Sequence, residues 1–356
     1  MKDLKYLTAY IVPILCVIGI YYRGFALFIT PPLIVFTIVP LIELIMPSLT
    51  SNLDAESKES KLKNKLFDIL LWLNVPIIFS VLIYGLYTYS ISNFETYEVI
   101  GLIFTLGIVA GSNGINVAHE LGHRQNSWER FLGKILLLPS LYMHFYIEHN
   151  YGHHVNAATP EDPASARYNE NLYAFWWRSV INQYKNSWSI QKRLLIAKDQ
   201  SIFSVKNDML WYSVIQLSYL MIIGISLSWM TSIIALCIAV VGFSLLEIIN
   251  YLEHYGLRRA QKKSGRYEVV KEIHSWNSNH VLGRILLYEL TRHSDHHYRA
   301  NKKYQLLDYH ENSPQLPYGY PTMMVIAMIP PLWFSIVNKH VPQEMVELSE
   351  NKNRHL

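Results

Sequence analysis

The sequence predicts an all-α polytopic membrane protein with six transmembrane helices and a helical cap that carries clustered histidines. Three observations lead to this prediction. The 356 residues are 51% hydrophobic and only 16% charged, a balance more typical of membrane proteins than of soluble domains. Several apolar runs are long enough to cross about 30 Å of hydrocarbon as helices. Nine of the 15 histidines fall in four short clusters.

Six apolar runs are predicted to span the membrane, and we expect one integral-membrane domain over residues 1–356. The runs cover residues 7–22, 25–46, 67–88, 98–118, 209–228 and 232–250. The first run could instead be a signal peptide, but no small-residue cleavage site follows it and the second run begins almost at once. The last two runs form one long apolar stretch, which we interpret as a helical hairpin.

The placement of lysine and arginine predicts the orientation. If Met1 is cytoplasmic, the outer connections, residues 23–24, 89–97 and 228–232, contain one basic residue, Arg23. Basic residues concentrate on the cytoplasmic side of membrane proteins. Both termini and the segments 119–208 and 250–320 are therefore expected to be cytoplasmic. The late apolar run, residues 321–337, contains Pro330-Pro331 and is predicted to be interfacial.

The four histidine clusters are predicted to meet in one layer at the inner membrane surface. They are HELGH, EHNYGHH, NYLEHYG and HSDHH. In the last cluster, helical spacings of three and four residues would bring all three histidines to one face. The expected metal ligands are His119, His123, His149, His153, His154, His254, His293, His296 and His297.

The number of histidines bears on the kind of metal site. HELGH alone matches the HExxH motif of zinc proteases, so a membrane zinc protease or a non-catalytic metal-binding protein is one alternative. A catalytic zinc takes three protein ligands, however, which leaves the other clusters unexplained. Nine imidazoles suit two transition-metal ions with four or five ligands each. Cys16 and Cys237 form no CxxC pair and so do not indicate an iron–sulfur site.

Each cluster also has an acidic residue beside an expected ligand: Glu120, Glu148, Glu253 and Asp295. Metal-bound histidines usually donate their second N–H to a carboxylate or a carbonyl. We expect these four acids to fill that role, either within a cluster or between clusters. Six histidines without a dense set of neighbours are left out of the ligand set: His144, His274, His280, His310, His340 and His355.

Six longer stretches make the pattern more specific. They are HELGHR (119–124), EHNYGHH (148–154), ATPEDPASAR (158–167), NYLEHYGL (250–257), HSWNSNH (274–280) and LTRHSDHH (290–297). In this order they resemble the motif set of the membrane alkane 1-monooxygenases, within the superfamily of histidine-box desaturases and hydroxylases. The resemblance implies a six-helix membrane bundle under a cytoplasmic cap, with a non-haem di-iron site held by the nine histidines alone.

The resemblance also implies an activity. A single hydroxylase domain in the bacterial inner membrane would use O2 to convert medium- to long-chain n-alkanes from the bilayer into primary alcohols. Rubredoxin and rubredoxin reductase would supply electrons, since the chain has no dinucleotide or flavin signature. A related enzyme on the same scaffold, a desaturase or hydroxylase of fatty acyl or alkylaromatic chains, is the main alternative. No basic block with interleaved aromatic residues indicates nucleic acid.

Two surfaces of such an enzyme can be assigned to residues. An alkane channel between the spans is expected to include Val35 and Phe36, although ordinary packing against lipid would also explain them. An acidic carrier would dock on basic residues, for which the sequence offers Arg258, Arg259, Lys262, Lys263, Arg266, Arg299, Lys302 and Lys303. Cytoplasmic loops near membranes are basic in any case.

Overall fold

The computed structural model describes residues 2–353 and confirms the all-α fold class. Within these residues it contains no strand, and its only bridges are the isolated pairs Ser48–His280, Gln261–Tyr267 and Asn277–Gln315. Six helical segments are long and apolar enough to cross a membrane: Asp3–Tyr22, Ala26–Ile45, Leu66–Ile91, Thr96–Gly122, Asp208–Ser226 and Trp229–His254. Each overlaps one predicted span. The chain divides into two compact units, and the predicted single domain stays a prediction.

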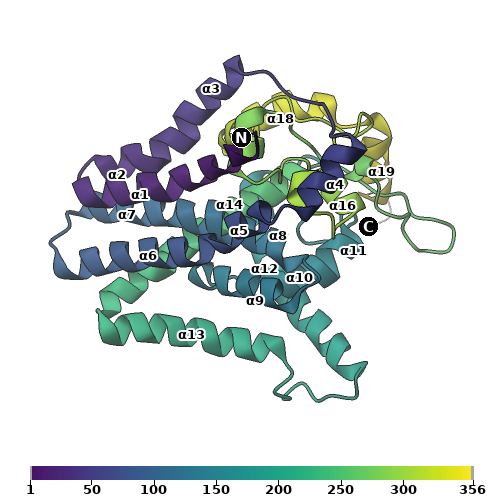
Figure 1. Cartoon of the computed structure of the whole chain (residues 1–356). Coiled ribbons are helices and arrows are strands. Elements are labelled where there is room, and N and C mark those ends of the chain that lie inside the picture. The colour runs from purple at the N-terminus through teal and green to yellow at the C-terminus, as the bar shows by residue number, and fades with distance from the viewer. Residues whose placement is uncertain (1, 354–356) are drawn as a thin grey trace. The chain divides into compact units, whose positions relative to one another are not determined.

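The first unit comprises Met1–Ile38, Lys65–Glu148 and Tyr184–Leu246. Its elements are η1 (Lys2–Tyr10), α1 (Ile11–Tyr22), α2 (Ala26–Phe28), η2 (Ile29–Ile38), α5 (Leu66–Trp72), α6 (Asn74–Ile91), α7 (Thr96–Val109), η3 (Ala110–Ile115), α8 (Asn116–Gly122), α9 (Ser127–Leu136), η4 (Leu138–Ser140), α10 (Phe145–Glu148) and α13 (Asp208–Ser226). Two further helices, α12 (Leu172–Ile196) and α14 (Trp229–His254), each have residues in both units. In Figure 1, α1, α6 and α7 run side by side.

Small residues allow the spans of this unit to pack closely. A Cβ atom on Gly107 of α7 would lie 2.5 Å from Cβ of Val241 in α14. One on Gly111 of η3 would lie 3.0 Å from the carbonyl oxygen of Gly242. Close packing of this kind stabilises helix pairs in lipid, where hydrophobic burial between helices gives no driving force.

Polar contacts fix the helix that leads to HELGH. Asn113 of η3 donates to the Asn74 side chain at 3.1 Å and to the Ala9 carbonyl at 3.1 Å. Both asparagines are buried. Because unpaired polar groups are costly in hydrocarbon, these bonds set the register of the turn that precedes α8.

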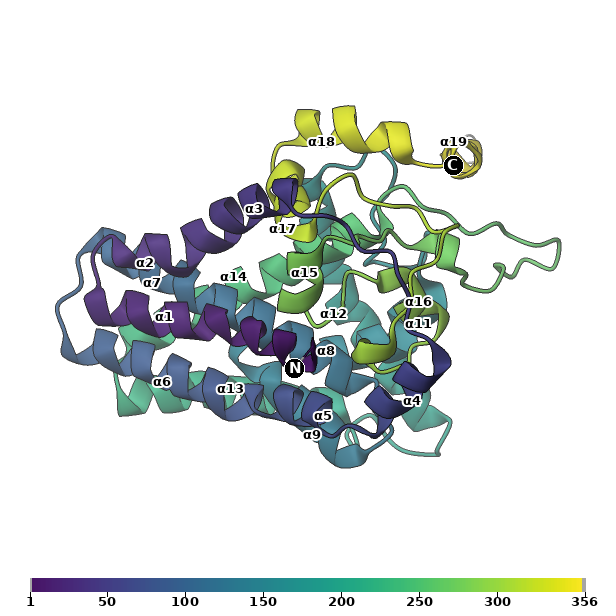
Figure 2. The same cartoon turned by 45° about the horizontal axis from the view of Figure 1, so that its top comes forward.

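The second unit comprises Val39–Asn64, His149–Gln183 and Glu247–Leu356. Its elements are α3 (Val39–Ile45), α4 (Ala55–Lys63), η5 (His149–His153), α11 (His154–Asn156), η6 (Glu272–His274), α15 (Val281–Leu286), α16 (His293–Tyr298), η7 (Tyr304–Leu306), α17 (Tyr320–Ala327), α18 (Pro330–Val337), η8 (Asn338–His340) and α19 (Gln343–Asn353). Figure 2 shows α17 and α18 as separate short helices. The second begins at Pro330-Pro331, as the sequence indicates, whereas its interfacial position stays a prediction.

Candidate metal centre

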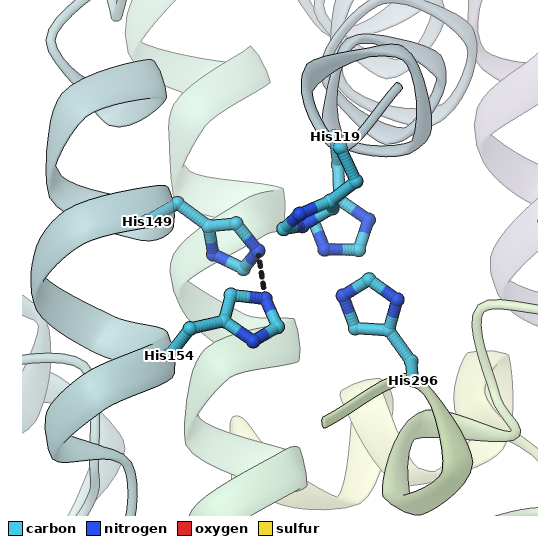
Figure 3. A group of neighbouring side chains, drawn as sticks. His119, His149, His154 and His296 are labelled. Carbon is cyan, nitrogen blue, oxygen red and sulfur yellow. Dashed lines mark hydrogen bonds between the residues drawn. The ribbon is translucent and has the colours of Figure 1, made fainter. Parts of the chain in front are cut away.

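Three expected ligands lie close together in the second unit, and we call them the trio: His149, His154 and His296. Nε2 of His149 lies 3.0 Å from Nε2 of His154, and the ring centroids of His154 and His296 are 5.0 Å apart. One ring nitrogen from each member lies within 4.8 Å of those of the others. Figure 3 shows the three rings pointing toward one another.

Four more ligands form a second group in the same unit, the quartet: His153, His254, His293 and His297. Nε2 of His153 lies 3.1 Å from Nε2 of His297, and Nε2 of His254 lies 3.3 Å from Nε2 of His293. All four side chains are buried. Burial, reinforced by His293 and His154, holds the pKa of His297 well below its usual value. Its imidazole is therefore neutral, as a metal ligand must be.

A π-helical turn separates the histidines of the second cluster. Residues His149–His153 form the π-helix η5. In an α-helix, residues five apart point about 140° away from each other, and those four apart share a face. The i→i+5 hydrogen bonds of a π-helical turn make it wider and bring residues five apart closer to one face. His149 thus meets His154, while His153 joins the quartet.

Helix α16 divides its histidines in the same way. The predicted helix is confirmed at His293–Tyr298, but its three rings do not serve one group. His293 and His297 belong to the quartet, and His296 belongs to the trio. Residues 149–154 and residues 293–297 therefore each supply expected ligands to both the trio and the quartet.

The spacing of the nitrogens fits metal ligation. Two nitrogens bound to one ion at about 2.1 Å lie roughly 3.0–3.4 Å apart when the angle at the metal is between 90° and 110°. The Nε2 pairs of the trio and quartet are separated by 3.0, 3.1 and 3.3 Å. The side chains are thus already arranged as nitrogen-rich sites for transition metals.

The remaining two expected ligands lie in the first unit. His119 is on the last turn of the fourth membrane segment and His123 directly follows that segment, with ring centroids 5.2 Å apart. The neighbouring Glu120 pairs with Arg124 at 3.0 Å, and Arg124 also lies 3.3 Å from Asp68. Glu120 is thus paired with an arginine one turn further along the chain.

The structure reveals a carboxylate partner that the sequence prediction missed. Oδ2 of Asp162 lies 2.9 Å from Nδ1 of His153, and it also accepts a hydrogen bond from the Ser165 hydroxyl at 2.6 Å. Burial alone would raise the pKa of Asp162, but His153 and Ser165 outweigh it and hold the pKa below its usual value. The ionised carboxylate therefore fixes the His153 ring with Nε2 toward the quartet. In the sequence, the stretch PEDPASAR, which contains both Asp162 and Ser165, was the signal that could have indicated this partner.

The acids predicted beside the ligands have varied partners. Glu253 lies 3.2 Å from Nε2 of His293, a ligand from another cluster, and accepts a hydrogen bond from the Tyr320 hydroxyl at 3.1 Å. Glu148 accepts a hydrogen bond from Asn186 at 3.2 Å. Glu253 thus lies beside an expected ligand of a different cluster.

Asp295 contacts residues outside the ligand set. Its carboxylate accepts hydrogen bonds from Lys302 Nζ at 2.6 Å and from the backbone N–H of Asp308 at 2.8 Å, and it lies 2.8 Å from Nε2 of His310. Lys302 also bonds Asp308 at 2.7 Å. These contacts hold α16 against the following loop.

The other predicted surface residues are placed as follows. Val35 and Phe36 are half-buried in η2. The guanidinium of Arg259 donates to the carbonyls of Val155 at 2.8 Å and Glu268 at 2.7 Å. The exposed basic residues are Lys262, Lys263, Arg266 and Arg299, while Arg258 and Lys303 are half-buried. Arg259 and Lys302 are half-buried and form bonds within the fold, and the predicted dock stays a prediction.

Five of the six histidines left out of the ligand set are described, and His355 lies outside the described residues. None belongs to the trio or the quartet, but His274 has a supporting part because its carbonyl lies 3.2 Å from Nδ1 of His254. His144 is fully buried beside Tyr142, and burial lowers its pKa to about 3. It is therefore a neutral core residue.

Comparisons with known proteins identify the family. The sequence profile of the fatty acid desaturase family matches residues 96–327. The chain belongs to this family. An alkane 1-monooxygenase of Pseudomonas aeruginosa is 37% identical over 309 residues, which are 86% of this chain and 81% of the relative. An alkane 1-monooxygenase of Alcanivorax borkumensis is 40% identical over 262 residues, which are 74% of this chain and 69% of the relative.

A more distant relative broadens the comparison. The hydroxylase component of a xylene/toluene monooxygenase of Pseudomonas putida is 24% identical over 348 residues, which are 95% of this chain and 89% of the relative. Within the desaturase family the chain groups with the alkane 1-monooxygenases, so the predicted resemblance is confirmed. This membership does not fit the zinc-protease interpretation of HELGH. With six apolar helices, the chain is an integral membrane member of the family.

Proposed function

We propose that the protein hydroxylates the terminal carbon of medium- to long-chain n-alkanes, with O2 as co-substrate and a primary alcohol and water as products. The observation that carries this proposal is the pair of histidine groups in a chain that aligns with alkane 1-monooxygenases over most of its length. An unactivated C–H bond has no acidic proton and no leaving group, so acid–base and nucleophilic catalysis do not suffice.

We further propose that nine histidines hold two iron ions. The quartet would ligate one ion, and the trio together with His119 and His123 would ligate the other. Imidazole nitrogen suits iron, whereas calcium and magnesium prefer oxygen ligands. Bound iron would supply the one-electron oxygen chemistry that amino-acid side chains lack.

The chain's own residues would orient the ligands and the substrate. Asp162 fixes the ring of His153, and the His274 carbonyl fixes that of His254. Such contacts set the tautomer and the orientation of a ligating histidine. A methyl C–H is stronger than a methylene C–H, so terminal selectivity must come from positioning, with a narrow apolar channel that presents the chain end first. We place Val35 and Phe36 in that channel.

Electrons would come from a rubredoxin and its reductase. The cytoplasmic face of the inner membrane is the proposed location of the metal centre and of both termini, because the basic residues concentrate there. An acidic carrier would meet the exposed residues Lys262, Lys263 and Arg299. The half-buried Arg258 and Lys303 complete the proposed dock. Turnover that is insensitive to salt and to charge reversal at these positions would contradict the dock alone.

The first experiment is a metal analysis of the detergent-solubilised protein, coupled to one assay of octane and hexadecane oxidation with rubredoxin, reductase, NADH and O2. We expect two irons per chain and formation of 1-alkanols. Zinc without oxidation would contradict the proposal, since zinc has no redox chemistry.

A second candidate, oxidation of alkylaromatic methyl groups, is favoured by the similarity to the xylene/toluene hydroxylase component over 95% of this chain. The same assay with xylene separates the two. Two irons per chain with xylene oxidised and alkanes untouched would replace the first candidate by the second. A desaturase would instead release an unsaturated fatty acyl product.

A further inference from the structure

A hairpin next to the quartet is built around two charged residues. It covers residues 258–274, and the isolated Gln261–Tyr267 bridge joins its two arms. The tip carries the exposed Lys262 and Lys263 and turns at Gly265, whose φ is +79°. Arg259 and Glu268 lie at the base of the hairpin and bond to each other, because the guanidinium Nε donates to the Glu268 carbonyl at 2.7 Å.

Arg259 joins the hairpin to the segment that follows His153. Its backbone N–H donates to the Ala158 carbonyl at 2.8 Å. Its Nη1 donates to the carbonyls of Val155 at 2.8 Å and Ala157 at 3.3 Å. Arg259 thus donates hydrogen bonds to three carbonyls, all within six residues of the quartet member His153.

Glu268 joins the two arms of the hairpin to the turn that ends at His274. Its Oε1 accepts from the N–H of Ala260 at 3.2 Å, and its Oε2 accepts from Lys271 Nζ at 2.7 Å. The same Oε1 lies 3.3 Å from Nε2 of His274. Hydrogen bonds from Lys271 and Ala260 outweigh burial and keep the pKa of Glu268 below its usual value.

His274 completes the connection to His254. Its ring is fully buried. Nδ1 accepts from the N–H of Lys271 at 3.0 Å, which leaves the ring proton on Nε2, facing Glu268. The His274 carbonyl, 3.2 Å from Nδ1 of His254, is the acceptor for that ligand's ring N–H.

We propose that Arg259, Glu268 and His274 are positioning residues that brace the quartet. They connect the segment after His153 to His254. The side chains of these two expected ligands must keep a fixed separation to bind the same ion. Both ends of this link and the hairpin itself lie within the second unit. The proposal rests on the proposed function only in requiring that the quartet hold a metal.

The test compares Glu268→Ala with Glu268→Gln in the full-length protein loaded with Fe²⁺ under anaerobic conditions. The alanine variant removes both acceptor oxygens, whereas glutamine keeps one for Ala260 and His274. Supporting residues around metal ligands typically contribute about 10–100-fold to metal affinity. We expect Glu268→Ala to lose about one iron per chain and to release the quartet's iron to a chelator at least tenfold faster, and Glu268→Gln to restore most of the binding.

Two further variants make the result specific. Ser264→Ala, at the exposed tip of the same hairpin, should keep both irons and wild-type release. His293→Ala removes a quartet ligand directly and defines the metal content of a chain with that group emptied. Adding Glu268→Ala to His293→Ala should cause no additional loss, because both changes act on one ion.

The outcomes separate the brace from the proposed function. Two irons with unchanged release in Glu268→Ala would overturn the brace and leave the proposed function standing. Equal loss from both metal groups, not rescued by Glu268→Gln, would show general destabilisation and would also overturn the brace. A wild-type protein that binds no iron would overturn both proposals.

Discussion

At the scale of single residues, Asp162 shows how a ligand is held from a distance along the chain. It lies nine positions after His153, beyond the cluster that supplies the ligand, and is fixed by Ser165. We predict that Asp162→Asn lowers metal affinity or activity about 10–100-fold, because the ring loses its ionised acceptor. Iron titration and alkane oxidation measure the effect. Glu161→Gln, a change at the exposed neighbour, should leave both unchanged, and an equal loss there would contradict the role of Asp162.

Asp308 makes a predictable contribution to pH-dependent stability. Burial would raise the pKa of this carboxyl, but hydrogen bonds from Lys302 and Lys58 outweigh burial and hold it below its usual 3.8. A carboxyl with a lowered pKa in the folded state stabilises the protein above the unfolded-state pKa and loses that contribution as the pH falls through the folded-state pKa.

The corresponding test follows the melting temperature from pH 7 to pH 3. We expect Asp308→Asn to lower it near neutral pH by an amount that corresponds to about 0.2–1 kcal/mol, and the difference from wild type to shrink below about pH 4. A difference that persists unchanged to pH 3 would show that the charge of Asp308 is not the cause. Lys61→Gln, on the same helix as Lys58, serves as the matched surface change.

At the scale of elements, the π-helical turn η5 decides which metal group each histidine joins. Deleting Tyr151 from this turn would leave spacings that suit an α-helix, with His149, His153 and His154 on one face. We predict that the deletion abolishes the separation into trio and quartet and removes at least one iron per chain. Tyr151→Ala should retain two irons, because that side chain is 48% exposed and the backbone turn stays intact. Iron content after purification distinguishes the two variants.

Element η2 carries the proposed channel residues. We predict that Val35→Trp shortens the longest alkane that is oxidised, because the added ring volume would block the far end of a narrow channel. A panel of n-alkanes with product analysis measures the change. Leu33→Trp, at a position of the same element that is 44% exposed, should not alter the profile. An unchanged profile for Val35→Trp would remove this residue from the channel.

At the scale of the whole molecule, the distribution of basic residues predicts that both termini are cytoplasmic. A green fluorescent protein fused after Leu356 should fluoresce in cells, and alkaline phosphatase fused there should be inactive. Phosphatase fused in the 89–97 connection should be active. The reverse pattern would place the metal centre on the other side of the membrane and would exclude a cytoplasmic electron carrier.

The sequence predicts the fold class and the membrane helices because hydropathy and length constrain a transmembrane helix strongly. The histidine clusters likewise identify the members of the trio and the quartet. The division between the groups could not be predicted, since His149 and His153 have α-helical spacing and a single π-helical turn changes their partners. The sequence also did not predict the partners of Asp162 and Lys302. Their partners depend on how loops fold back, which neither spacing nor composition encodes.

His254 is the last residue of α14, a helix of 26 residues, which is about 39 Å long at 1.5 Å per residue. A hydrophobic helix that does not match the local bilayer thickness responds by tilting. Tilting of α14 displaces its terminal imidazole directly, while the His274 carbonyl holds the other side of that ring. We therefore expect lipid composition to act on the proposed metal coordination through hydrophobic mismatch, so that iron retention would depend on the acyl-chain length of the host membrane.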